Sequence, residues 1–180
     1  MIGPQNFKIK NQPGFTLMEM TIFVFLVGAF TAAVVLLANQ YVQDNQKARS
    51  YQDVQQNARF AMQRIIQEIR GANDLTAGAS TFGVNPGVLT VSNDDAAKDP
   101  TIFDISNGRL RIKQGTGAPQ PLTSDKVRIT NLVFTNLSVN NKTKNIRIQM
   151  TVQHYNPSGV NFLSASTSLE ATAVIREQQG

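Results

Sequence analysis

The feature that most constrains this chain is an uncharged, apolar run close to its N-terminus. The nineteen residues from Met20 to Ala38 contain no Asp, Glu, Lys or Arg. A run of about 18 or more such residues is long enough to cross a membrane as a helix, whereas buried helices of soluble proteins usually have shorter apolar runs. The sequence therefore predicts a membrane anchor.

One carboxylate stands at the N-terminal edge of this run, because Glu19 directly precedes Met20. An ionisable group at hydrocarbon depth is costly unless it has a partner. If the chain were cut after Gly14, the new amine at Phe15 would lie about one helical turn from Glu19. The two charges could then pair within one helix or between neighbouring helices. The alternative is that Glu19 lies at interfacial depth and reaches water.

The residues before the run are polar and basic. Residues 1–14 carry Lys8 and Lys10 and no acid, which is typical of a segment that stays on the cytoplasmic side of a membrane. An ordinary secretory signal has a shorter apolar region and an A-x-A-like cleavage site, which Leu36–Gln40 matches poorly. We interpret residues 1–14 as a leader peptide.

These features together resemble a known family. The stretch Gly14–Glu19 (GFTLME), after a basic leader and before an apolar helix, resembles the class III signal of type IV pilins and type II secretion pseudopilins. The resemblance implies that a prepilin peptidase cuts between Gly14 and Phe15 and then N-methylates Phe15. It also implies that Glu19 acts in filament assembly.

The same resemblance implies partners and a location. The partners would be prepilin peptidase, other pilin or pseudopilin subunits, an inner-membrane assembly platform and membrane lipid. The chain would cross the cytoplasmic (inner) membrane once, with its C-terminal domain outside, and then enter a periplasmic or cell-surface filament. Pili, secretion pseudopili and competence filaments share this signal, so the sequence leaves open which machine it serves.

A single long helix is expected to follow the leader. No proline occurs in residues 14–85, and Arg70-Gly71 is a helix stop signal. Apolar residues in the second half recur at three- and four-residue steps, as in a helix that covers a sheet. They are Tyr51, Val54, Ala58, Ala61, Met62, Ile65 and Ile69. We predict a helix over about residues 15–70, with a membrane or filament-core part (15–41) and an amphipathic part (42–71).

Two positions inside the membrane half bear on packing. Gly28 would permit close approach of another helix or local melting, although glycine is also simply common in membrane helices. Many major pilins have a proline that would fall near Leu36, and this chain departs from that pattern.

Beyond Gly71 the pattern changes to that of a sheet. Residues 72–100 are rich in Gly, Asn, Asp and Ala and predict a loop with one short strand at 88–91. Alternating apolar and polar residues then predict an antiparallel sheet with one solvated face. The expected strands are 101–105, 109–113, 127–139, 146–154 and 163–175, with turns at Asn107-Gly108 and 140–142.

The predicted fold class is therefore α+β, with a long N-terminal helix packed on an antiparallel sheet in a head of residues 72–180. The resemblance makes this a type IV pilin-like fold. The order of its parts further resembles the minor pilin and J-type pseudopilin branch.

The residue inventory argues against catalysis, and we expect no enzyme and no cofactor. The chain has no cysteine and a single histidine, His154, and it has neither a G-x-S-x-G elbow nor a phosphate-binding loop. Asn93-Asp94-Asp95 with Asp99 could hold Ca²⁺, but the spacing is not that of an EF-hand and a solvated turn explains it as well.

A row of cations on one predicted strand raises the question of nucleic acid. Arg109, Arg111 and Lys113 alternate with apolar residues and could face DNA, yet such a row is more often the wet face of a strand. The formal net charge of +5 does not require a nucleic-acid partner. DNA is thus a possible partner that the sequence does not indicate.

Two function classes are compatible with these residues. The first is a structural filament subunit, a minor pilin or pseudopilin. The alternative is an uncleaved, single-pass membrane-anchored binding module that does not polymerise. Whether the mature chain begins at Phe15 separates them.

Overall fold

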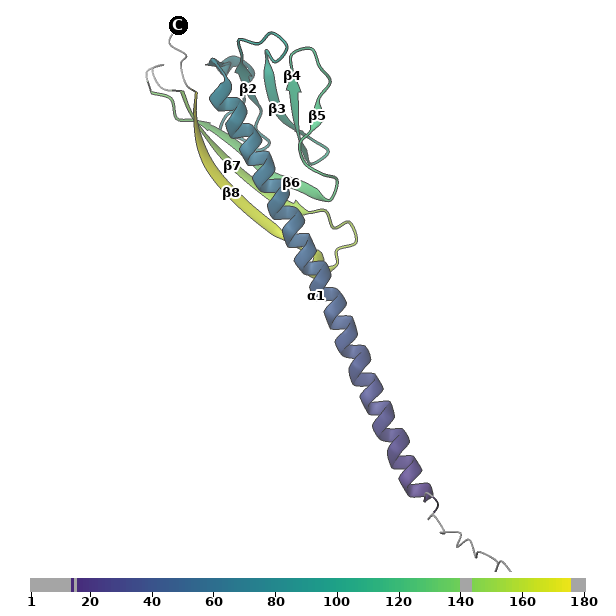
Figure 1. Ribbon diagram of the computed structural model, residues 1–180. Coiled ribbons are helices and arrows are strands. Elements are labelled where there is room, and N and C mark those ends of the chain that lie inside the picture. Colours follow the sequence, from purple (N-terminus) through teal and green to yellow (C-terminus); the bar gives the residue numbers. More distant parts are fainter. Residues whose placement is uncertain (1–13, 15, 140–143, 176–180) are drawn as a thin grey trace, which may run out of the picture. The chain divides into compact units, whose positions relative to one another are not determined.

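The computed structural model describes residue 14 and residues 16–139 and 144–175. The chain divides into two compact units, with the boundary between Val42 and Gln43. One helix, α1 (Leu17–Gly71), contributes residues to both units (Figure 1). The predicted long helix is confirmed, while Phe15, where it was expected to begin, lies outside the described residues.

The C-terminal unit, the head, combines the second half of α1 with antiparallel strands. The strands are β1 (Asp74–Leu75), β2 (Leu89–Ser92), β3 (Thr101–Ser106), β4 (Arg109–Gln114), β5 (Gln120–Pro121), β6 (Val127–Asn136), β7 (Lys144–His154) and β8 (Ser166–Ile175). Two 3-10 helices, η1 (Ala77–Ala79) and η2 (Asn161–Leu163), lie between them. The predicted α+β class is confirmed.

The strands form two sheets, whereas the sequence predicted one. The described strands pair in the orders β1-β2-β3-β4-β5 and β6-β7-β8. Loops rather than a strand ladder join β6 to the first sheet: Gly87 N donates to Leu132 O, and Ile129 N donates to Gly108 O, each at 2.8 Å. A Cβ on Gly87 would lie 3.2 Å from Leu132 O, so the absence of a side chain lets the loop come this close.

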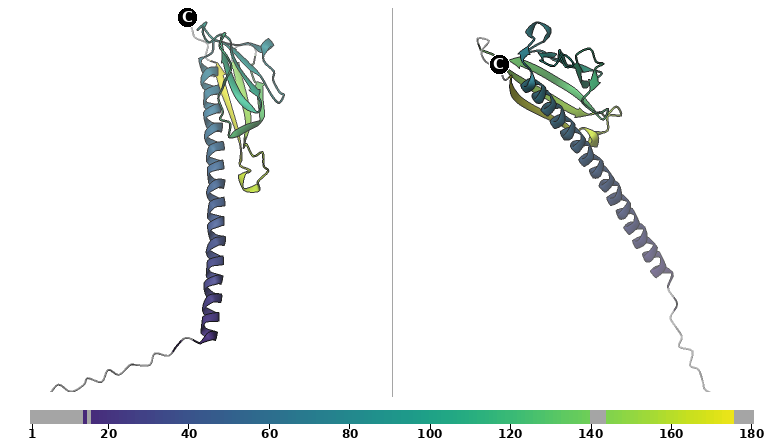
Figure 2. Two further views of the ribbon diagram at one scale, coloured as in Figure 1. Left: turned by 90° about the vertical axis from the view of Figure 1, so that its right-hand side faces the viewer. Right: turned by 45° about the horizontal axis from the view of Figure 1, so that its top comes forward.

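The apolar stripe of α1 packs on the inner faces of both sheets. In Figure 2 the second half of α1 and the strands form two layers of the head. The buried residues come from α1, from the five-stranded sheet and from the three-stranded sheet. They include Val54, Ala58, Ala61, Ile65 and Ile69; Leu89, Phe103 and Leu110; and Leu132, Phe134, Ile146 and Ile148. This shared core supplies most of the apolar burial that stabilises the head.

The prediction that the apolar stripe of α1 begins at Tyr51 is wrong. Tyr51 is 41% exposed, and the buried residue at this end of the head is Ser50. Its hydroxyl donates to Lys47 O at 2.8 Å, which satisfies the buried polar group within the helix.

Strand boundaries also differ from the prediction. β6 ends at Asn136, and β8 begins at Ser166 because residues 161–163 form η2. Residues 72–100 contain β1 and η1 besides the expected short strand. The turn at Asn107-Gly108 is confirmed, since both residues have positive φ (52° and 70°), whereas residues 140–142 lie outside the described part.

Ile65 gives a test of the core. Its side chain has 0% exposure, so Ile65→Asp would bury an unpaired carboxylate among apolar groups. We expect residues 43–180 to fold alone as a monomer, and the variant to lose about 3 kcal/mol or more of stability in thermal unfolding followed by circular dichroism. Gln63→Asp, on the exposed face of the same helix, is the matched control and should change stability by less than about 1 kcal/mol. Equal stability of the two variants would show that Ile65 does not face a core.

Candidate functional site: the N-terminal half of the helix

The first half of α1 is an apolar helix without cover from the described chain. Every residue from Thr16 to Arg49 is exposed, including Phe25 at 74%. The most apolar 18-residue window has a mean hydropathy of 2.6, and none of it is buried. Such a helix is long and apolar enough to cross a membrane once. Its large exposed apolar surface calls for lipid or other protein around it.

Thr16 caps the first turn of this helix. Its Oγ1 accepts a hydrogen bond from Glu19 N at 3.2 Å, and its carbonyl oxygen accepts from Glu19 N at 3.1 Å and from Met20 N at 3.2 Å. Thr16 and Glu19 thus form the T-x-x-E pattern of a capping box, in which the acid can return to the N–H of the capping residue. In the structure Thr16 makes the cap, and the Glu19 side chain makes no return bond to the Thr16 N–H.

The Glu19 carboxylate itself has no partner among the described residues. It is the one acid in the first turn of α1, and its side chain makes no hydrogen bond or ion pair there. Phe15, the predicted site of the amine and of methylation, lies outside the described residues, and Gly14 before it is exposed. The structure therefore places a carboxylate at the start of an exposed apolar helix, where a negative charge also suits the helix dipole.

Polar groups farther along the span are satisfied within the helix. The hydroxyls of Thr21 and Thr31 donate to Met18 O and Val27 O, each at 2.8 Å. Gly28 lies in unbroken helix, and a Cβ there would meet no atom within 4 Å. The described chain therefore makes no close contact that requires a glycine at this position, and both readings of Gly28 stay predictions.

The three carboxylates of the candidate calcium loop accept hydrogen bonds from the protein itself. Asp94 accepts from the Asn73 side chain, Asp95 accepts from Ala97 N at 3.0 Å, and Asp99 accepts from Asn93 N at 3.1 Å. Among the described residues no cluster of three or more His, Cys, Asp or Glu could hold a metal ion. These carboxylates stabilise the loop through hydrogen bonds to nearby residues.

Two of the three cations on β4 are held by their own chain. Arg109 donates to Thr123 O through Nε at 3.2 Å and Nη2 at 3.0 Å. Arg111 donates to the two carboxylate oxygens of Asp104 at 2.9 and 2.6 Å, and this bond raises the pKa of the Arg111 guanidinium. Both arginines are thus already engaged, which weakens the case for a DNA-facing row.

A similar ion pair links the two sheets of the head. Lys144 Nζ lies 2.7 Å from Asp74 Oδ1, and its hydrogen bond lowers the pKa of the Asp74 carboxyl. The pair joins β1, in the five-stranded sheet, to β7, in the three-stranded sheet. It is a partly exposed link between the sheets rather than a chemical site.

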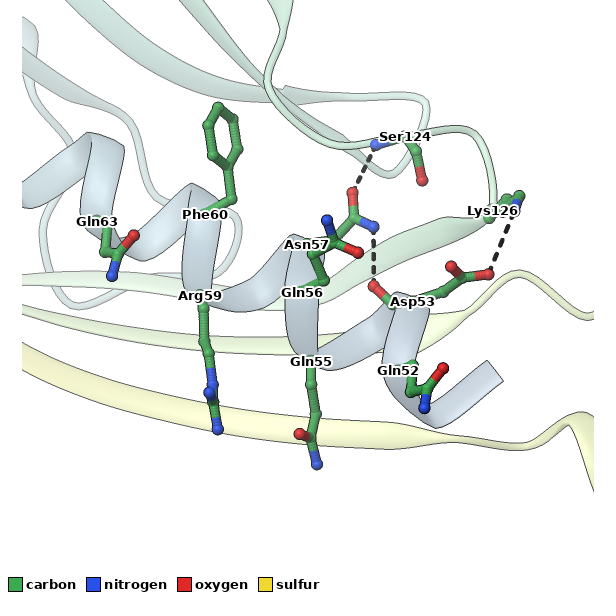
Figure 3. Close-up of a pocket in the computed structure, with 10 residues that line it drawn as sticks. All are labelled: Gln52, Asp53, Gln55, Gln56, Asn57, Arg59, Phe60, Gln63, Ser124 and Lys126. Carbon is green, nitrogen blue, oxygen red and sulfur yellow. Dashed lines mark hydrogen bonds and ion pairs between the residues drawn. The ribbon is translucent and has the colours of Figure 1, made fainter. Parts of the chain in front are cut away.

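An open groove of about 830 Å³ lies beside α1 in the head (Figure 3). Asn57 lies at its centre: its Oδ1 accepts from Ser124 N at 2.9 Å, and its Nδ2 donates to Asp53 O at 2.8 Å. Lys126 lies 3.4 Å from the Asp53 carboxylate. The bonds attach the segment between β5 and β6 to the helix. Sequence reasoning missed Asn57 because one amide beside an apolar stripe carries no pattern.

Comparison with protein-family models, curated proteins and solved structures finds no match to this chain. The exposed helix and its terminal carboxylate therefore have to be interpreted from their own chemistry.

The Thr16 cap can be tested by hydrogen exchange. Thr16→Val keeps the shape of the side chain but removes the acceptor, which should cost about 1 kcal/mol of local stability. We expect the Glu19 amide of the detergent-solubilised chain to exchange roughly fivefold faster. Thr16→Ser keeps the hydroxyl and should retain protection. Unchanged exchange in Thr16→Val would mean that the hydroxyl does not cap the helix.

Proposed function

We propose that this chain is a structural subunit of a type IV filament, a minor pilin or pseudopilin of the J-type branch. In this proposal a prepilin peptidase cleaves it between Gly14 and Phe15 and methylates Phe15. The subunit then assembles through its N-terminal helix with other pilin or pseudopilin subunits, on an inner-membrane platform. It would pass from the inner membrane into a periplasmic or cell-surface filament.

The observation that carries the proposal is the GFTLME stretch at the start of α1. A basic leader precedes Gly14, and an apolar helix follows Glu19 at once. An ordinary membrane anchor needs the apolar run but does not require a carboxylate at its edge, where the helix dipole alone offsets part of the cost of the charge. The combination is accounted for by cleavage, because cleavage creates the amine that such a carboxylate requires.

The exposed first half of α1 supports the same proposal. A helix with an apolar surface on all sides is stable either in lipid or inside a bundle of other helices. A filament subunit needs both surroundings in succession. The lack of cover from Thr16 to Arg49 is compatible with that exchange.

The first test of the proposal is the mature N-terminus. In cells with an active prepilin peptidase, mass spectrometry of the membrane-extracted chain should show loss of residues 1–14 and gain of one methyl group. Gly14→Leu should block cleavage at the same junction, because the peptidase of the resembled family cuts after glycine. An intact N-terminus in these cells would favour the uncleaved, membrane-anchored binding module instead.

The second test separates the charge of Glu19 from the capacity of its side chain to complete a capping box. An unpaired acid at the centre of a membrane helix costs about 3 kcal/mol, and less near the edge, so removing the charge should not impair insertion. Glutamine can replace glutamate in a capping box but cannot pair with an amine by charge. We therefore expect Glu19→Gln to be inserted, cleaved and stable, yet to be depleted from purified filaments in an immunoblot.

Glu19→Asp is the matched control, because it keeps the charge on a shorter side chain and should retain partial incorporation. Incorporation of Glu19→Gln at the wild-type level would contradict the pairing and leave completion of the capping box as the role of Glu19. The membrane fraction of each variant, blotted in parallel, shows whether a loss from filaments reflects loss of the protein.

A further inference from the structure

Arg128 on β6 is held rigidly by the head. Its Nη1 donates to Asp125 O at 3.0 Å and to Val127 O at 2.9 Å. Its guanidinium carbon lies 3.8 Å from the centre of the Tyr155 ring, a cation–π contact. On the turn between β3 and β4, Gly108 leaves room for the stem of Arg128, because a Cβ there would lie 2.5 Å from Arg128 Cδ.

This fixed arginine has unused hydrogen-bond donors. Its Nε and Nη2 have no acceptor among the described residues, and no carboxylate of the described chain lies within ion-pair distance. Arg111 shows what this edge of a guanidinium does in the same protein: its Nε and Nη2 grip both oxygens of Asp104. Arg128 thus presents a preorganised fork that fits a carboxylate and holds none.

Arg128 lines a hollow of about 350 Å³ between the end of β7 and the starts of β6 and β8. The other lining residues are Gln153, His154, Tyr155, Asn156, Ser164, Ala165 and Ser166. Arg128 is the only Lys, Arg, Asp or Glu among the described lining residues, so the hollow attracts anions. His154 also has a buried Nδ1 without a hydrogen-bond partner in the described part of the chain. Buried polar atoms are rarely left without a partner, and this one belongs to a residue that lines the hollow.

We propose that this hollow binds a small hydroxylated carboxylate of the uronic-acid class. The carboxylate would take the Nε–Nη2 edge of Arg128, and the hydroxyls would bond to the amide and hydroxyl groups at the rim. Gln153 and Ser166 have exposed side chains without a hydrogen bond to the described residues, so both are available for this. The site lies wholly within the head and does not depend on the proposed filament function.

The lining favours a sugar acid over an acidic peptide. Recognition of a peptide through its side chains uses a groove with apolar side-chain pockets. Among the described lining residues Ala165 is the only aliphatic one, and the volume is near the lower end for small-molecule sites, about 300 Å³. Amides and hydroxyls around one cation match a compact ligand that carries several hydroxyls and one acid group.

The test is a titration of the full chain in detergent, without a histidine tag, with glucuronate. His154 is the single histidine of the sequence, so its ring gives an unambiguous NMR signal from the hollow. We expect a saturable shift with glucuronate, a shift at least about tenfold weaker in affinity with acetate, and none with glucose. Saturable binding of glucose as tight as that of glucuronate would overturn the role of the carboxylate.

Variants locate the site. Arg128→Gln should abolish the saturable shift and Arg128→Lys should weaken binding about tenfold, since lysine cannot form the fork. Arg147→Gln, which removes an exposed strand arginine paired with Glu170 outside the hollow, should bind as the wild type does. Unchanged glucuronate affinity in folded Arg128→Gln would refute the proposal.

Two further variants test the site even if the Arg128 variants do not fold. Ser166→Phe fills the hollow from the exposed start of β8 and should abolish binding with Arg128 left in place. Gln153→Ala should weaken glucuronate more than acetate, because it removes only a hydroxyl partner. Retained binding in Ser166→Phe would place the ligand elsewhere, and equal binding of a blocked Gly-Glu-Gly peptide would show that the site takes acidic peptides instead.

Discussion

The head depends on one constraint, the burial of a continuous apolar stripe on α1 by two sheets at once. Val54, Ala58 and Ile65 have 0% exposure, and their small or β-branched side chains let the strands come close to the helix axis. Each sheet alone would leave an apolar face in water. The helix is therefore the element that makes one core out of two sheets, and the loop contacts around Gly87 and Gly108 complete the junction.

The sequence predicted the elements in which a helical or alternating pattern repeats over many residues. α1, β4 and β7 have apolar residues at helical or alternating steps, and burial along β7 follows that alternation from Ile146 to Val152. The apolar run also predicted the membrane-spanning first half of the helix, with Glu19 at its N-terminal edge. The sequence did not predict β1 or β5, because each has two residues and two residues are too few to show a repeating pattern.

The division into two sheets and the features of the sites could not be predicted for a different reason. They arise where residues far apart in sequence meet, as Gly108, Arg128 and Tyr155 do around one guanidinium. On the sequence Arg128 is one of several strand arginines, and His154 is a lone histidine at a strand end. Only the fold shows that Arg111 has a carboxylate and Arg128 has none among the described residues.

The two halves of α1 are stabilised by different means, and this difference bears on the proposed filament role. From Ser50 onward the helix is held by burial within its own chain, whereas residues 16–49 have no buried member. A change of surroundings for the first half, from lipid to other subunits, therefore exchanges one apolar environment for another without breaking a buried contact of the head. Because lipid and protein helices are similarly apolar, the hydrophobic effect gives little preference between them. In the proposed filament, selectivity for the assembled state would have to come from close packing, for which Gly28 leaves room, or from a polar pair, for which Glu19 supplies the carboxylate.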